Sequence, residues 1–110
     1  MRSAEIHWHD SIIVRVVELP TVSVAFQIEY PEDWERDIYV NKTVLIGEIF
    51  SYQIHEGPFV GPITILGATE ATGADDSRLI RIETNAGYRE LRFKTLDLLD
   101  EHVTGLSGHQ

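Results

Sequence analysis

Apolar and polar residues alternate along this chain with a period of two, most regularly between residues 22 and 30. The even positions of this segment are apolar: Val22, Val24, Phe26, Ile28 and Tyr30. Because successive side chains of a β-strand point to opposite faces of its sheet, the pattern predicts a half-buried strand. The preceding residues 11–19 are β-branched nearly throughout, and only a short link around Pro20 follows them. We therefore predict that the two segments form an antiparallel hairpin.

A second hairpin is predicted within residues 78–93. Asn85-Ala86-Gly87 is a turn signal between two short runs that alternate in polarity. A three-residue loop would set Ile82 opposite Glu90, which is unfavourable for an apolar face. A two- or four-residue loop instead sets Ile80 and Ile82 opposite apolar or long-stemmed residues, so we predict one of those two loop lengths.

The segments between and after these hairpins are less regular. Residues 38–55 are β-branched and aromatic, with a bulge or bend expected at Gly47. Residues 31–37 predict a loop or a single helical turn, and residues 69–77 predict a surface loop. Residues 57–62 contain two prolines and predict an irregular loop or a sheet edge. Residues 95–110 leave two alternatives open, a short helix capped by Thr95 or a strand that continues through Leu98.

These patterns define the expected fold class. The length of 110 residues corresponds to one domain, residues 1–110. Short β segments with turns at irregular intervals are typical of all-β proteins. We predict an antiparallel β-sandwich or a partly open barrel of about seven short strands, with at most one short helix.

The charge of the chain restricts its partners. Its 18 acidic residues exceed its 9 basic residues and give a formal charge of −9. Such a field repels phosphate groups, so we expect no nucleic acid or anionic membrane as partner, and it favours a basic protein. Five of the nine basic residues gather in one C-terminal segment: Arg78, Arg81, Arg89, Arg92 and Lys94. Their alternation with glutamates predicts a solvated sheet face rather than a binding patch.

Residue types and segments that the sequence does not contain also restrict the possible functions. The chain has no cysteine, which excludes disulfides and thiolate metal sites. It has no apolar run near the ~18 residues that a membrane span needs. Its start resembles no secretory signal, so a cytoplasmic location is the expectation.

The stretch His7-Trp8-His9-Asp10 is the first candidate for site chemistry. On a strand, His7 and His9 would project from the same face, which suits two nitrogen ligands of Zn²⁺ or a similar divalent metal. His55, with Glu56 beside it, could supply further ligands, and an open site of this kind could activate water for hydrolysis. The alternative is a strand whose other face holds Ile6 and Trp8, closed by a turn at Asp10-Ser11.

Templates for other catalysis do not occur in the sequence. It contains no cysteine nucleophile, no Gly-x-Ser-x-Gly elbow, no phosphate-binding glycine loop and no His-Glu-x-x-His pair. We therefore favour a binding protein over an enzyme. A homodimeric barrel that binds a small ligand is a further alternative.

The second candidate is an aromatic residue among carboxylates. Trp34 lies between Asp33 and Glu35, with Glu32 and Asp37 close by. An exposed tryptophan with an acidic rim would be an anchor for a basic protein, because indole is enriched at binding hot spots. Alternatively, Trp34 folds back over the end of the sandwich and covers the core.

The opening HWHDSIIVRVVE, in which His9-Asp10-Ser11 precedes an alternating strand, resembles the start of small bacterial immunity-type proteins and their uncharacterised relatives. The resemblance covers about a dozen residues. It implies a compact β-sandwich that binds and neutralises a cognate toxin. It also implies that His9 and Asp10 define the fold rather than catalyse a reaction.

Overall fold

The computed structural model describes residues 1–20 and 22–100. Eight strands form within these residues, and no α-helix does. The strands are β1 (Ile12–Leu19), β2 (Ser23–Asp33), β3 (Ile38–Gly47), β4 (Ser51–Glu56), β5 (Ile63–Thr72), β6 (Arg78–Thr84), β7 (Gly87–Phe93) and β8 (Thr95–Leu99). Three short 3₁₀ turns are η1 (Ser3–Glu5), η2 (Trp34–Arg36) and η3 (Ala74–Asp76). The predicted all-β class is confirmed.

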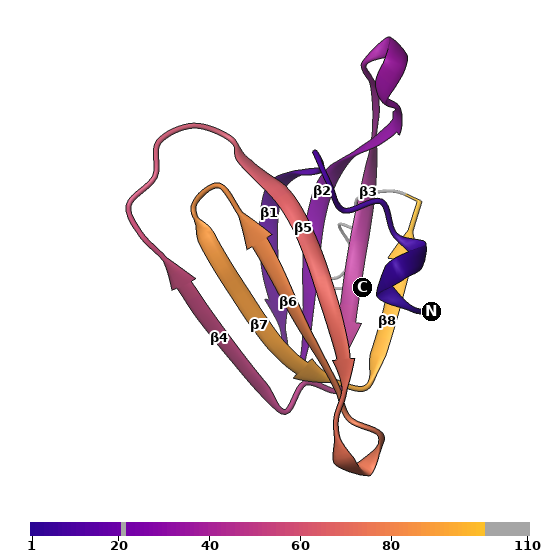
Figure 1. Cartoon of the computed structure of the whole chain (residues 1–110), viewed down its shortest axis with the longest axis vertical. Coiled ribbons are helices and arrows are strands. Elements are labelled where there is room, and N and C mark those ends of the chain that lie inside the picture. The colour runs from indigo at the N-terminus through magenta and orange to yellow at the C-terminus, as the bar shows by residue number, and fades with distance from the viewer. Residues whose placement is uncertain (21, 101–110) are drawn as a thin grey trace.

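All strands pair antiparallel in the order β4-β7-β6-β5-β1-β2-β3-β8. The β1–β5 pairing comprises only Ile12 with Thr64 and Ile13 with Ile63. Beyond this short joint the two strands diverge, and the sheet folds into two layers that face each other (Figure 1). The end strands β4 and β8 do not pair with each other in the described residues, so the architecture is an open sandwich and not a closed barrel.

The core fills the space between the two layers. It draws apolar side chains from both layers and from the N-terminal segment: Ile6, Trp8, Val24, Phe26, Ile28, Val44, Ile46, Ile65, Ile80, Ile82, Leu91, Phe93 and Leu96. Val24, Phe26 and Ile28 of β2 are buried, as their even spacing predicts. The odd residues Ala25 and Gln27 are buried as well, because β2 lies between two neighbouring strands whose side chains cover it. The prediction of a half-buried strand therefore holds for the core face and is wrong for the opposite one.

Both predicted hairpins are present. The register of β1 and β2 runs from Ile12 opposite Glu29 to Leu19 opposite Ser23. Strands β6 and β7 are closed by a two-residue turn, Asn85-Ala86, which sets Ile80 opposite Leu91. Of the two predicted loop lengths, two and four residues, the structure has the shorter one.

Two loop expectations need correction, and the structure decides between the two alternatives left open for residues 95–99. Strand β2 continues through Pro31, where the register shift before Asp33 accommodates a residue that cannot donate a ladder bond. Strand β5 continues to Thr72, because each residue from Gly67 to Thr72 pairs with β6. Residues 95–99 form strand β8 and not a helix, since Leu96 is buried beside β3. Residues 101–110 of the predicted tail lie outside the described residues.

The arginine-rich segment does not lie entirely on a solvated face. Arg81 does stand opposite Glu90 on the outer face, with Nη1 to Oε2 at 3.6 Å, as predicted. Arg78 and Arg89 are instead mostly buried, with side chains 18% and 14% exposed, and each pairs with a glutamate. Arg78 has the same parity as Ile80 on its strand, so the core-facing side of the sheet includes it.

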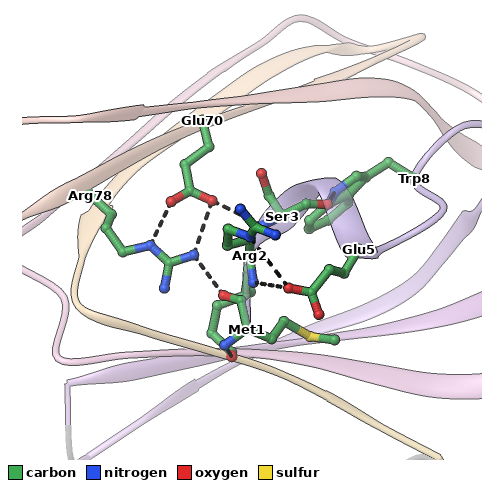
Figure 2. A network of polar contacts seen from close by, with 8 residues as sticks. Met1, Arg2, Ser3, Glu5, Trp8, Glu70 and Arg78 are labelled. Carbon is green, nitrogen blue, oxygen red and sulfur yellow. Dashed lines mark hydrogen bonds and ion pairs between the residues drawn. The ribbon is translucent and has the colours of Figure 1, made fainter.

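The N-terminal segment packs across the edge of β5. The backbone N–H of Ser3 donates to Oε1 of Glu70 at 3.0 Å, and Arg78 donates to the carbonyl oxygen of Met1 at 2.7 Å (Figure 2). The indole Nε1–H of Trp8 donates to the carbonyl oxygen of Ser3 at 2.8 Å. These bonds fix the segment against the sheet and bury Trp8. In the described residues no helix is long and apolar enough to span a membrane.

Candidate functional site

The most prominent surface feature is the outer end of the β2–β3 hairpin. Strands β2 and β3 continue past the rest of the sheet and are joined by the turn η2, so that this end projects as an arm (Figure 1). Within it, Pro31 pairs with Tyr39 and Asp33 pairs with Ile38. We call residues 31–39 the acidic arm. Because it is a paired β-ribbon, it holds its side chains on a defined scaffold.

The arm carries a strong excess of negative charge. It contains four carboxylates, those of Glu32, Asp33, Glu35 and Asp37, against the single guanidinium of Arg36. Arg36 Nε lies 3.6 Å from Asp33 Oδ2, and this exposed pair neutralises one carboxylate at most. The other three acidic residues are exposed. The arm therefore presents net negative charge to solvent.

Apolar side chains accompany these charges. Ile38 and Tyr39 at the start of β3 are both exposed. At the base of the arm, the phenol oxygen of Tyr30 accepts a hydrogen bond from the backbone N–H of His7 at 2.8 Å. Lys42 Nζ lies 5.2 Å from the centre of the Tyr30 ring. The base is thus tied to the N-terminal segment, while the outer part combines charge with exposed apolar surface.

The structure places the three residues of the predicted anchor together on this arm. Asp33 is the last residue of β2, and Trp34 and Glu35 begin η2. Their proximity follows from their adjacency in the sequence, whereas the projection of this turn from the sheet does not. Their role in binding stays a prediction.

The predicted histidine pair lies elsewhere, beside the start of β5. His7 and His9 are exposed, whereas Ile6 before His7 and Trp8 between the two histidines are buried, which matches the alternation expected of an extended segment. His9 Nδ1 lies 3.0 Å from the carbonyl oxygen of Leu66. Its Nε2 lies 3.4 Å from Asp10 Oδ1. One histidine nitrogen thus already has a backbone partner.

Asp10 closes a turn. Its φ is +71°, in the left-handed region that Asp tolerates better than most residues. The N–H of Ser11 donates to the carbonyl oxygen of Trp8 at 3.1 Å across this turn. The Ser11 hydroxyl donates to the carbonyl oxygen of His7 at 3.0 Å. His9-Asp10-Ser11 therefore performs a conformational task in this fold.

His55 is located on strand β4, at one end of the sheet order. Its ring stacks on Tyr88 of β7 at 4.7 Å between centroids, and its Nε2 lies 3.2 Å from Gln53 Oε1. Across residues 1–20 and 22–100, no group of three or more His, Asp or Glu side chains is close enough to hold a metal ion. The structure therefore does not assemble His7, His9 and His55 into a three-ligand site for zinc.

A partly buried polar cluster on β4 and β7 was not predicted. Arg89 donates from Nε to Glu56 Oε2 at 2.7 Å and from Nη2 to Glu56 Oε1 at 2.9 Å. Its Nη1 donates to the phenol oxygen of Tyr52 at 2.5 Å. Burial raises the pKa of Tyr52 despite the nearby guanidinium, and the hydrogen bonds to Glu56 raise the pKa of Arg89. Both shifts keep Tyr52 neutral and Arg89 charged at neutral pH, so the cluster acts as a cross-link between strands.

The remaining positive charges of the C-terminal segment line a hollow at the surface. Arg92 and Lys94 face it together with Phe50, Asp75 and Ser77. Arg92 Nη1 donates to Ser77 Oγ at 3.4 Å, and Lys94 Nζ lies 5.7 Å from the centre of the Phe50 ring. Both cations are exposed, as the sequence predicts for this face.

Comparison with known families gives no matching family model, and comparison with curated proteins gives no matching relative.

Proposed function

We propose that this chain is a protein-binding domain that engages a basic protein through the acidic arm. The observation that carries the proposal is the arm itself, a projecting β-ribbon with exposed carboxylates beside exposed Ile38 and Tyr39. Surfaces of this kind use charge to guide the encounter and apolar area to hold the complex. The overall charge of −9 extends the attraction beyond the arm.

The two kinds of side chain have different tasks in this proposal. Exposed carboxylates at the rim of an interface change the association rate and its dependence on salt more than they change the final affinity. Tyrosine is enriched at interfaces because its ring combines apolar area with a polar hydroxyl. We therefore assign recognition of the basic partner to Glu32 and Glu35, and much of the contact energy to Ile38 and Tyr39.

The resemblance to immunity-type proteins suggests which basic protein to test first. Under this proposal the partner is a toxin domain with a basic surface, and the domain neutralises it by covering that surface. The turn at His9-Asp10-Ser11 then supports the fold and does not contact the partner.

The proposal is tested with the basic proteins encoded by the neighbouring genes. Binding of each purified protein is measured by isothermal titration calorimetry at low and at moderate salt. The double variant Glu32→Lys/Glu35→Lys is compared with Glu83→Lys/Asp97→Lys, which makes the same change in charge at exposed residues away from the arm. We expect binding that weakens at least tenfold, about 1.4 kcal/mol, in the arm variant and far less in the control. Equal losses in the two variants, or binding by neither the natural chain nor its control, would contradict the proposal.

A further inference from the structure

Strand β4 has an outer edge that no described strand covers. It ends the sheet order and pairs only with β7, in a register that sets His55 opposite Tyr88. Gly57 N–H donates to the carbonyl oxygen of Ala86 at 3.1 Å and continues this ladder. Because ladder bonds alternate along an antiparallel strand, Ser51, Gln53 and His55 bond toward β7. The backbone groups of Tyr52, Ile54 and Glu56 therefore point outward.

This edge lacks the devices that usually protect an edge strand. It has no lysine, arginine or proline between Ser51 and Glu56, and its pairing with β7 shows no bulge. Strand β1 offers a contrast within the same molecule, because its edge beyond Ile13 also pairs with no described strand on the β5 side. That edge carries a register shift at Val14 and the charge of Arg15. The β1 edge is therefore protected against pairing with another strand, and the β4 edge is not.

Exposed apolar side chains flank the unprotected edge. Ile54 in the middle of β4 is 50% exposed, and Phe50 just before the strand is 55% exposed. In the loop after the strand, Phe59 is 42% exposed and Val60 is 97% exposed. Four large apolar side chains within eleven residues thus remain in water along one edge of the molecule. Exposed apolar surface of this kind marks interaction sites.

We propose that β4 pairs with β4 of a second copy of this chain and so forms a two-fold dimer with a continuous sheet. A two-fold axis perpendicular to the sheet keeps each side chain on its own face, so residues opposite each other must be an even number of positions apart. The register that uses all three outward-facing residues sets Ile54 opposite Ile54 of the second copy. It also sets Tyr52 opposite Glu56 of the second copy, and every outward N–H and carbonyl of these residues finds a partner.

The same register accounts for the apolar residues outside the strand. Past Glu56, each chain continues along the start of β4 in the other copy, where Phe50 is located. The loop that holds Phe59 and Val60 therefore covers Phe50 of the second copy, and the reverse contact follows by symmetry. The apolar surfaces at the two ends of the edge are complementary to each other.

Charge favours a second copy as the occupant of this edge. The only ionic side chain of β4 is Glu56, and both of its carboxylate oxygens accept hydrogen bonds from Arg89 of the same chain. Two chains of charge −9 can approach along this locally neutral edge, whereas a basic partner would find no free carboxylate on it. The inference does not depend on the proposed function, because it uses none of the residues of the arm.

The experiment is sedimentation equilibrium of the full chain over a wide concentration range, with two matched variants. Ile54→Lys places a charge at the centre of the edge. Val14→Lys changes a side chain of similar exposure, 53%, on the protected edge of β1. We expect the natural chain and Val14→Lys to approach twice the monomer mass of 12.5 kDa, and the dissociation constant of Ile54→Lys to rise at least tenfold.

Hydrogen exchange of the natural chain gives an independent readout that needs no variant. The amides of Tyr52, Ile54 and Glu56 should exchange more slowly as the concentration rises, while those of β1 beyond the joint should not change. A monomer at every concentration would overturn the proposal. So would a dimer that Ile54→Lys leaves intact, because that dimer would use another surface.

Discussion

The guanidinium of Arg78 holds the carboxylate of Glu70 through two parallel hydrogen bonds, from Nε to Oε2 at 2.5 Å and from Nη2 to Oε1 at 3.0 Å. Oε1 also accepts the backbone N–H of Ser3 (Figure 2). Neither side chain of the ion pair is more than 18% exposed. The pair connects β5, β6 and the N-terminal segment, so its charge state affects three parts of the fold at once.

Protonation of Glu70 should destabilise the fold in acid. The hydrogen bonds from Arg78 lower the pKa of Glu70 from 4.5 to about 2. A carboxyl whose pKa is lower in the folded state stabilises the fold above its unfolded pKa, and this contribution is lost as the pH falls from 4.5 toward 2. We expect a loss of up to about 3 kcal/mol over this window. Urea unfolding at a series of pH values measures it.

Glu70→Gln is the variant for that experiment. It should be less stable than the natural chain at neutral pH and should lose the part of the acid dependence that belongs to Glu70. Glu83→Gln, whose side chain is 58% exposed, serves as the control and should keep the full dependence. Parallel pH curves for the natural chain and Glu70→Gln would assign the acid dependence to other carboxyl groups.

Replacing Glu56, the partner of Arg89, should lower the free energy of unfolding more than replacing both residues of the pair. In Glu56→Gln the guanidinium, with its side chain 14% exposed, loses its counter-charge and keeps Tyr52 as a neutral partner. We expect this variant to lose about 2–3 kcal/mol, because an unpaired charge remains largely out of water. In a separate cycle, the double variant Glu56→Met/Arg89→Met should lose less stability than the sum of the losses of Glu56→Met and Arg89→Met. Chemical denaturation at neutral pH gives all four values of the cycle, and additive losses would show that the pair is not coupled.

A methyl group at Gly87 should disturb the turn between β6 and β7. Gly87 has φ of +143°, and a Cβ built on it would overlap the carbonyl oxygen of His55 and lie 2.9 Å from Cα of Glu56. We expect Gly87→Ala to cost about 1–3 kcal/mol, since the backbone of β4 must move away. Gly57→Ala is the matched control, because its Cβ would meet no heavy atom within 4 Å. Thermal unfolding compares the two, and equal midpoints would contradict the close approach of β4 to β7.

Much of this fold follows from the alternation of side chains. The pairing of β1 with β2 and of β6 with β7 could be predicted because each hairpin is local and has a clear apolar face. The position of Arg78 on the core side is also implied by its parity with Ile80. Its partner Glu70 could not be predicted, because the sequence predicts a surface loop over residues 69–77 and only the pairing of β5 with β6 brings the two residues together.

The candidate sites also combine features that the local sequence predicts with features that depend on tertiary structure. Exposure of His7 and His9 follows from their alternation with buried neighbours, and the acidic character of residues 31–37 is evident in the sequence. The projection of the arm depends on how far β2 and β3 pair beyond the sheet, which is a tertiary property. The open edge of β4 depends on the strand order, which no local pattern of residues 51–56 specifies.

The strand order also has a consequence for how this chain is completed during synthesis. Strand β3 leaves one layer, β4 to β7 build the facing layer, and β8 then returns to pair with β3, with Thr43 opposite Leu99. Until β8 emerges from the ribosome, the side of β3 that faces away from β2 is an exposed template for other strands. Closing such a distant contact is slow compared with hairpin formation. The nascent chain is therefore most vulnerable to misassembly in the interval before β8 is made.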